Sequence, residues 1–253
     1  MQREPFDPLE FERLADGVAW VREVHAFAQT GSTNDEAARL ARKGAPEGTV
    51  VVADVQTAGR GRLDRAWVTE PGTALMTSFV VRFAGPSADR PLLTLATAVA
   101  AARAIERTAG VDVRLKWPND LLASRGKLGG ILAEAVDDAV VIGLGVNVRQ
   151  SEFPPELASI ATSLLRERSR PVGRGALLGA ILDEFAPYAA RPRDAMPEYR
   201  SRCATIGREV RVSRSGGRPV EGTATAVDDA GALRVRTAGG DVAITAGDVV
   251  HVR

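Results

Sequence analysis

The chain has 253 residues, of which 45% are hydrophobic, so it can bury a full core and has room for one large domain and a small one. Its 33 Lys and Arg nearly balance 32 Asp and Glu, and the formal charge of +1 supplies no global field that would attract nucleic acid or an anionic membrane. The single cysteine, Cys203, excludes an intramolecular disulfide, and with two histidines it cannot form a His/Cys zinc cluster without carboxylates.

The N-terminal part of the chain predicts little regular structure before the first helix. Residues 1–24 carry scattered apolar side chains, enough for one short helix or a packing arm but too few for a three-helix DNA-reading module. No basic leader or membrane-length apolar run is found, so a soluble, cytoplasmic protein is expected. A helix is expected over 35–43, ended by Gly44. Runs rich in β-formers predict strands at 49–55 and 74–83.

The middle of the chain alternates between helical and extended patterns. Alanine and leucine at helical spacing predict a buried helix over 92–107. Three strands are expected after it, at 113–117, 128–136 and 140–148, followed by two helices at 157–167 and 175–190. Pro192 and Pro197 then indicate a boundary. This order predicts an α+β domain over residues 1–200, with a mixed sheet covered by helices.

The last fifty residues differ from the rest. Short alternating runs are separated by glycine-containing turns, which is typical of hairpins. Strands are expected at 209–212, 220–227, 233–236, 242–245 and 249–252. Five short strands predict a small β barrel over residues 205–253.

The first motif is Gly31-Ser32-Thr33-Asn34. Thr33 and Glu36 have the spacing of a capping box, so a helix start alone explains these residues. Hydroxyls and an amide at a helix mouth can also hydrogen-bond a small polar head group such as a urea carbonyl. Taken by itself, this motif favours the helix start.

The second motif runs from Gln56 through Gly59, Arg60 and Gly61 to Arg62, with Trp67 beyond it. Glycines let the backbone approach a ligand, and guanidinium groups pair with carboxylate or phosphate. A solvated flexible loop is the alternative. The pattern matches neither a Walker loop nor the dinucleotide fingerprint, so any phosphate binding here is of another type.

The third motif, Lys116-Trp117-Pro118-Asn119-Asp120, lies at a strand end. Proline ends the ladder, so Asn119 and Asp120 are expected in a turn that can face a pocket. A turn with a surface lysine accounts for the same residues equally well.

The fourth motif, residues 127–134, begins with a lysine and a glycine pair. In an extended strand Lys127, Gly129, Ile131 and Ala133 share one face, so the amine is expected to overlook a flat, glycine-floored groove. Glycines that admit a closely packed helix are the alternative.

The fifth motif, residues 143–148, alternates glycine with apolar residues. Gly143, Gly145 and Asn147 are expected on one bare face, and the Asn147 amide can pair with an adenine edge. A bulge followed by an asparagine turn remains the other interpretation.

Together, in this order and spacing, the motifs resemble the biotin protein ligase family from Thr30 onward, and the pair GRGR and KWPND is the most specific part. The resemblance implies a catalytic α+β domain related to class II aminoacyl-tRNA synthetases, a C-terminal SH3-like barrel, and biotin, ATP and Mg²⁺ as ligands. It also implies a biotin carboxyl carrier protein or domain as partner. Because the helix-turn-helix of repressor members is missing, the chain resembles the short monofunctional type, for which no DNA or membrane binding is expected. A homodimer is left open.

The resemblance also implies the site residues. The biotin-binding residues would be Ser32, Thr33, Asn34, Gln56, Gly59, Arg60, Gly61, Arg62, Lys127, Gly129 and Gly130. The ATP-binding residues would be Arg62, Trp67, Lys116, Asn119, Lys127 and Asn147. Lys127, Arg60, Arg62, Lys116 and Asp120 would be catalytic, with Asp120 as a Mg²⁺ contact. Leu63-Asp64-Arg65 departs from the more basic, glycine-containing continuation of some members.

Three rival functions share some of these features. A lipoyl or octanoyl protein ligase has a related fold and also modifies a carrier lysine. A biotin-responsive transcriptional regulator and a small-molecule binding module without turnover belong to other classes. Titration with biotin against lipoate, salt-dependent DNA binding, and pyrophosphate release would separate them.

Overall fold

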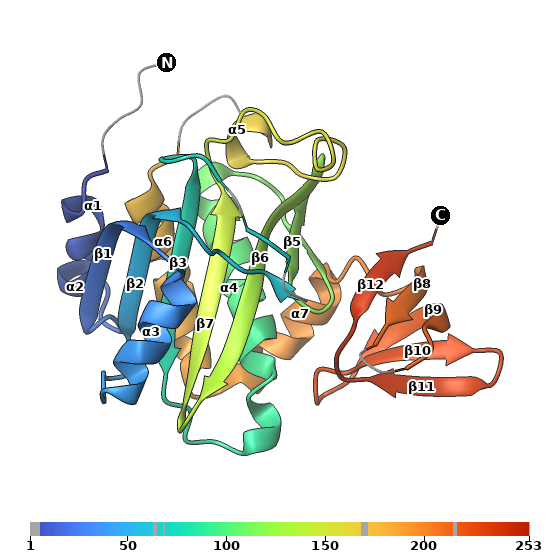
Figure 1. Ribbon diagram of the computed structural model, residues 1–253. Helices are drawn as coiled ribbons and strands as arrows, with labels where there is room; N and C mark the ends of the chain where they lie inside the picture. The colour runs from blue at the N-terminus through green and yellow to red at the C-terminus, as the bar shows by residue number, and fades with distance from the viewer. Residues whose placement is uncertain (1–5, 63–64, 68, 168–171, 215–216, 253) are drawn as a thin grey trace.

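The computed structural model describes residues 6–62, 65–67, 69–167, 172–214 and 217–252. Its larger part is built on a seven-stranded mixed sheet in the order β1-β2-β3-β7-β6-β5-β4 (Figure 1). The strands are β1 (Glu23–Thr30), β2 (Thr49–Gln56), β3 (Ala74–Val81), β4 (Arg114–Lys116), β5 (Asp120–Ala123), β6 (Gly126–Val136) and β7 (Ala139–Asn147). β1 runs parallel to β2, and the other neighbours are antiparallel.

One face of this sheet is covered by long helices. The alanine-rich α4 (Leu92–Ala109) is buried on most sides, as its composition predicts, and ends at Gly110 in the left-handed conformation that glycine adopts readily. α6 (Arg174–Ala189) packs beside it, and Phe185 from α6 meets Phe79 of β3 in the main core. The short helices α1 (Leu9–Glu12) and α2 (Leu14–Gly17) complete this side near β1.

The opposite face carries only partial helical cover. α3 (Thr33–Arg42) packs its alanines on Val51, Val80 and Val141 to form a second, smaller core. Beyond α3, the segment that follows β2 crosses in front of β7 and β6 (Figure 1). This arrangement leaves the β7–β6–β5–β4 end of the sheet face for the glycine-rich motifs.

The C-terminal part is a five-stranded antiparallel sheet in the order β11-β10-β9-β8-β12, consistent with the expected SH3-like barrel. Its strands are β8 (Glu209–Ser213), β9 (Val220–Val227), β10 (Leu233–Thr237), β11 (Gly240–Ile244) and β12 (Asp248–His251). The main core continues into this sheet through Val210 and Leu233. The indole of Trp117 donates to the Gly231 carbonyl at 2.9 Å, so the barrel is joined to the large sheet by both apolar and polar contacts.

The predicted α+β class and most elements are confirmed. β1 and β5 were not predicted at all. The helix expected over 157–167 is limited to α5 (Leu164–Glu167). α6 ends before the two prolines, and the segment around them is helical, with a 3-10 helix over Pro192–Ala195 and α7 over Met196–Arg202, because proline is accepted in the first turn of a helix. The division of the chain near residue 200 stays a prediction. Among the described residues, no helix is long and apolar enough to cross a membrane.

Candidate active site

A single row of residues crosses five strands on the open sheet face. Lys116 of β4 pairs with Asp120 of β5, Asp120 with Gly130 of β6, Gly130 with Gly145 of β7, and Gly145 with Met76 of β3. Residues directly opposite one another in neighbouring strands point to the same face. The row therefore places a cation and a carboxylate at one end of a floor in which two neighbouring positions, Gly130 and Gly145, carry no side chain.

The predicted face of β6 was wrong in register. The pairing of β5 with β6 shifts between Leu121 and Leu122, which leaves Leu128 as an extra, bulged residue. A bulge moves every side chain beyond it to the other face. Gly129 thus faces the core with Ile131. Lys127 instead shares the open face with Gly130, because its ammonium lies 3.5 Å from where a Cβ on Gly130 would be.

The alternation predicted for β7 is confirmed, because Gly143 and Gly145 share one face, and side chains from other segments rest on both glycines. A Cβ on Gly145 would lie 2.7 Å from the indole ring of Trp67. A Cβ on Gly143 would lie 2.1 Å from the Asn34 amide oxygen. The indole Nε1 of Trp67 is buried without a hydrogen-bond partner among the described residues. Glycine at these two positions is what lets an aromatic ring and an amide rest on the sheet.

The start of α3 forms a buried polar network with β2 and β3. Gln56 Oε1 accepts from the Thr33 amide at 2.7 Å and lies 3.1 Å from the Thr33 hydroxyl. Ser78 Oγ is 2.8 Å from Thr33 Oγ1 and donates to Asn34 Oδ1 at 2.6 Å. The Asn34 amide in turn donates to Glu134 at 2.6 Å. These polar groups are thus fixed at the helix mouth before any ligand binds.

The capping-box explanation of this motif was wrong. Ser32 is the N-cap residue of α3, but its side chain makes no cap hydrogen bond. The Glu36 carboxylate pairs with Arg39 at 2.8 Å and not with the helix start. Ser32 and Thr33 are nevertheless buried, so helix capping does not account for them.

The glycine-arginine segment folds back on itself as a short ladder. Gly61 donates to the Arg65 carbonyl, Trp67 donates to the Gly59 carbonyl, and Arg60 forms a bridge with Ala66. A Cβ on Gly59 would lie 2.6 Å from the Trp67 carbonyl oxygen, so glycine is required there. The ladder brings Trp67 over the floor. Leu63 and Asp64, named above as a departure from the family, lie outside the described residues.

The arginines of this segment are ion-paired or partly buried. The Arg60 guanidinium holds the Asp35 carboxylate with contacts of 3.0 and 2.7 Å, and Glu134 lies 3.7 Å away. Arg62 Nη1 donates to Asn119 Oδ1 at 3.4 Å. Burial lowers the pKa of Arg62, while Asp248 and Asp120 oppose that change. The segment thus presents cations to the row of floor residues.

The cations at the end of the row are also held by neighbours. The Lys127 ammonium lies 2.6 Å from an oxygen of Asp120. Asn119 lies in the turn between β4 and β5, where its side-chain amide donates to the Ile131 carbonyl and its backbone carbonyl accepts from the Ile131 amide. Asp120 was expected in the same turn but is the first residue of β5. Lys116 is close enough to His251 of β12 to lower the pKa of that imidazole.

The structure brings together nearly all of the predicted residues. Asn147 lies at the end of the same strand face and donates to the Thr162 carbonyl at 3.0 Å. Four residues that sequence reasoning missed also take part: Asp35, Met76, Ser78 and Glu134. Each is an ordinary residue in a helix or strand, and only the assembled sheet gives it a partner. Bare glycines, buried amides and clustered cations define a site for a thin, flat ligand that carries negative charge.

Comparison with known proteins agrees with this class of site. Residues 26–147 match the Biotin/lipoate A/B protein ligase family, and residues 205–252 match the Biotin protein ligase C terminal domain. A biotin--[acetyl-CoA-carboxylase] ligase of Mycobacterium tuberculosis is 38% identical over 99% of this chain and 97% of its own length. The bifunctional ligase/repressor BirA of Bacillus subtilis is 38% identical over 86% of this chain and 70% of its own length.

A solved structure is similar along nearly the whole chain. The biotin protein ligase from Aquifex aeolicus in complex with biotin and ATP has a TM-score of 0.79 at 27% identity, over 92% of this chain and 99% of that one. The class that the fold and site define is therefore that of the biotin and lipoate ligases. Within that class, the chain belongs to the biotin protein ligase family and is an enzyme.

Proposed function

We propose that this chain couples biotin to a lysine of a carrier protein in two steps, through a biotinyl-adenylate. A carboxylate is a poor electrophile, so its oxygen first attacks the α-phosphorus of ATP and pyrophosphate leaves. The carrier lysine then attacks the mixed anhydride and AMP leaves. The observation that carries the proposal is the row from Lys116 to Met76, with bare glycines beside a cation cluster.

The biotin end of the site is assigned to the polar network at the start of α3. Ser32 and Thr33, with Gln56, supply hydroxyl, amide and carbonyl groups at a buried helix mouth, which suits the ureido ring of biotin. Asn34 lies beside these groups, with its amide over Gly143. Gly130 beyond it carries no side chain and leaves room for the thin acyl chain.

The chemical step is assigned to the cations. Joining a carboxylate to a triphosphate brings anions together and builds negative charge on the phosphoryl oxygens. Arg60, Arg62, Lys116 and Lys127 would neutralise this charge, with Lys127 nearest the glycine floor. Trp67 and Asn147 would place the adenine, since one offers a ring face over Gly145 and the other an amide. Gly59 and Gly61 let the loop close over the adenylate.

Magnesium is assigned to the nucleotide and to Asp120. The described residues contain no group of three carboxylate, histidine or cysteine side chains that could hold a metal ion by themselves. Mg²⁺ commonly uses one or two carboxylates together with substrate phosphates and water, and the half-buried Asp120 beside the cation cluster fits that role. The ion would supply further neutralisation of phosphate charge.

The partner of the second step is a biotin carboxyl carrier protein or domain, as the family relationship suggests. The balanced charge supports neither DNA nor membrane binding. A cytoplasmic location, argued from the lone cysteine, and a possible homodimer stay part of this proposal.

The deciding experiment is transfer of labelled biotin to a purified biotin carrier domain in the presence of ATP and Mg²⁺. We expect label on the carrier lysine and equimolar AMP and pyrophosphate. Lipoate in place of biotin separates the lipoyl ligase alternative, because that enzyme would label the carrier with lipoate and not with biotin. Biotin binding without pyrophosphate would indicate a binding module and contradict the proposal.

A further inference from the structure

The Glu167 carboxylate collects hydrogen bonds from two separate parts of the chain. The Ser124 hydroxyl donates to Oε2 at 2.6 Å, and the Arg125 amide donates to Oε1 at 3.1 Å. Both residues form the turn between β5 and β6. The Thr162 hydroxyl donates to Oε1 at 2.7 Å from the segment that precedes α5. One side chain thus ties the β5–β6 turn to residues 157–162.

The two parts that Glu167 joins meet again at Lys127. The Lys127 amide donates to the Ile160 carbonyl at 2.7 Å, and the Thr162 amide donates to the Lys127 carbonyl at 2.9 Å. Gly126 fits against the same segment, because a Cβ there would lie 2.5 Å from the Ile160 carbonyl oxygen. The backbone of the lysine that overlooks the floor is therefore held by residues 160–162.

The two large apolar side chains of residues 157–162 are exposed, although Ala161 and Thr162 at the end of the segment are buried. Leu157 and Ile160 expose 41% and 58% of their surface, and the helical turn of α5 begins only after them. Segments with little buried apolar surface open at low cost. The hydrogen bond from Thr162 to Glu167 and that from Asn147 to the Thr162 carbonyl add to the backbone bonds with Lys127 in holding this segment, and Arg166 also donates to the Ala161 carbonyl.

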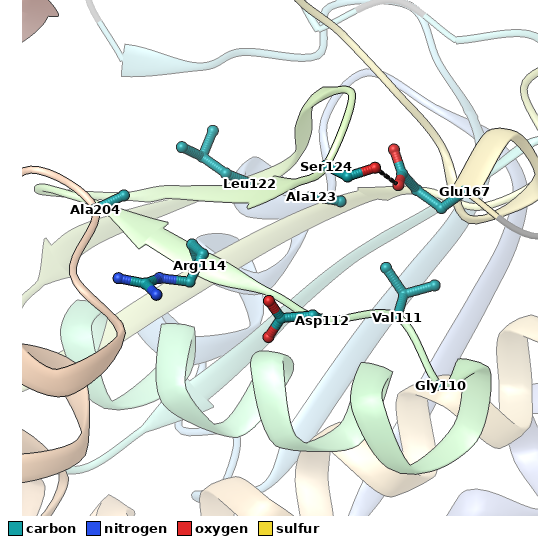
Figure 2. A pocket seen from close by; sticks show the side chains of 9 residues that line it. All are labelled: Gly110, Val111, Asp112, Arg114, Leu122, Ala123, Ser124, Glu167 and Ala204. Carbon is teal, nitrogen blue, oxygen red and sulfur yellow. Dashed lines mark hydrogen bonds between the residues drawn. The ribbon is translucent and has the colours of Figure 1, made fainter.

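Glu167 lies away from the reacting groups. It lines a separate cavity of about 380 Å³ with Ser124, Leu122 and Arg114, where the sticks of Figure 2 show its carboxylate directed at Ser124. Burial alone would raise the pKa of Glu167, but its hydrogen bonds from Ser124, Thr162 and Arg125 outweigh burial and bring the pKa below its ordinary value. The carboxylate is thus charged, and charged acceptors make the stronger hydrogen bonds.

We infer that Glu167 is a positioning residue for adenylation, which fixes the Lys127 ammonium over the glycine floor by clamping the β5–β6 turn to residues 157–162. The inference rests on the role proposed above for Lys127. Losing the clamp loosens the lysine without removing it, so the chemical step suffers while the biotin pocket at the start of α3 stays intact.

The test compares Glu167→Ala with Glu167→Gln. Alanine removes every acceptor. Glutamine keeps Oε1 for Thr162 and Arg125 and turns its amide to Ser124, whose hydroxyl can accept. We expect Glu167→Ala to lower kcat for biotin-dependent pyrophosphate release by about 10- to 100-fold, as misplacement of a reacting group does, with the KM for biotin unchanged. We expect Glu167→Gln to recover most of the rate, and Thr162→Val to give a smaller loss in the same direction.

Amide hydrogen exchange supplies a readout that does not depend on turnover. Peptides covering 124–128 and 157–163 should exchange faster in Glu167→Ala and return toward wild type in Glu167→Gln. Glu184→Ala is the matched control, because this partly exposed carboxylate on α6 pairs with Arg103 and Arg107 and does not contact the site. Its kcat and its exchange in these peptides should equal those of the wild type.

Two results overturn the inference. Unchanged exchange in Glu167→Ala would show that no clamp exists. Faster exchange with an unchanged kcat would show that the clamp does not position Lys127. Should Glu167→Ala fail to fold, Thr162→Val and Glu167→Gln carry the same comparison. Absence of pyrophosphate release by the wild-type enzyme would contradict the proposed function, whereas the exchange pattern would still report on the clamp.

Discussion

Lys127 is fixed at both of its ends. Its backbone is bound by residues 160–162, and its ammonium lies 2.6 Å from Asp120 and beside Gly130. A cation held in place before substrate arrives needs little reorganisation when negative charge develops. Lys127 should therefore matter far more to the rate of adenylation than to the stability of the fold.

We predict that Lys127→Ala lowers biotin-dependent pyrophosphate release by about 10²-fold or more, the usual effect of removing one preorganised charge-stabilising group. A coupled assay for pyrophosphate checks it, with circular dichroism to verify folding. Lys43→Ala, at the exposed end of α3, is the matched control and should keep the wild-type rate. A Lys127→Ala enzyme with a near wild-type rate would remove this lysine from the mechanism.

We predict that Gly145→Ala displaces Trp67, because the new methyl group would lie 2.7 Å from the indole ring. Overpacking of this kind costs about 1–3 kcal/mol of unfolding free energy. Denaturant unfolding would measure that loss, and steady-state kinetics should show a raised KM for ATP. Gly17→Ala serves as the control, since a Cβ at Gly17 meets nothing within 4 Å. Wild-type stability together with a wild-type KM would contradict the placement of Trp67.

At the residue scale, the sequence predicted the chemistry of the site better than its geometry. The shared face of Gly143 and Gly145 followed from simple alternation and was confirmed. The face on which Lys127 lies could not be predicted in this way. The bulge at Leu128 depends on the pairing of β5 with β6 and does not change the spacing of residues in the sequence. Ser78 acquires its role only when β3 meets α3, and Asp35 only when the segment after β2 brings Arg60 to it.

At the scale of elements, β12 and the β4–β5 turn are linked through Thr205. His251 Nε2 lies 3.2 Å from Thr205 Oγ1, which also accepts from the Trp117 amide at 3.1 Å. Burial lowers the pKa of His251, and Lys116 and Arg208 lower it further. The imidazole is therefore neutral in the folded protein at neutral pH, and a neutral ring nitrogen can accept the Thr205 hydroxyl proton.

This depressed pKa predicts a pH-dependent stability. In the unfolded chain a histidine binds a proton at about pH 6.5, above the pKa of folded His251, so the unfolded state binds more protons over that interval. The free energy of unfolding should thus decrease as the pH falls through about 6.5 and level off below the folded pKa. Denaturant titrations at a series of pH values measure it.

The decrease in the free energy of unfolding as the pH falls should be smaller in His251→Gln than in the wild type. Identical pH profiles for wild type and His251→Gln would contradict the assignment.

Elements with strong local patterns were predicted well, and those set by tertiary contacts were not. α4 and the runs of β2, β3 and β7 are buried along nearly their whole length, so composition alone indicates them. β1 contains no fully buried residue and pairs only with β2, which leaves a weak pattern. Residues 157–162 look helical by composition, but Ile160 and Thr162 use their backbone groups on Lys127 instead.

At the scale of the whole molecule, one apolar core runs through both sheets. Leu115 and Trp117 of the large sheet belong to the same buried cluster as Val210 and Leu233 of the barrel. Ion pairs between Arg193 and Asp89 and between Arg65 and Asp248 lie around it. Two sheets that share a buried core cannot separate or unfold independently without exposing apolar surface to water.

We therefore predict that the two sheets unfold together in a single transition. Differential scanning calorimetry should give a calorimetric enthalpy equal to the van't Hoff enthalpy. Two resolved transitions would show that the barrel is an independent unit. Arg65→Ala is the control for the polar contacts, and because that side chain is mostly exposed it should change the unfolding free energy by no more than about 1 kcal/mol.

Arg60 and Lys127 each form an ion pair with an internal carboxylate, that of Asp35 and that of Asp120. If these cations have the roles proposed for them, Asp35 and Asp120 occupy the places that substrate anions would take. A phosphate or carboxylate that binds there would displace these internal carboxylates from their cations, and would displace few mobile salt ions. Affinity for ATP should accordingly decline less steeply with ionic strength than the number of nearby cations would suggest, because few counterions are set free when the exchange takes place.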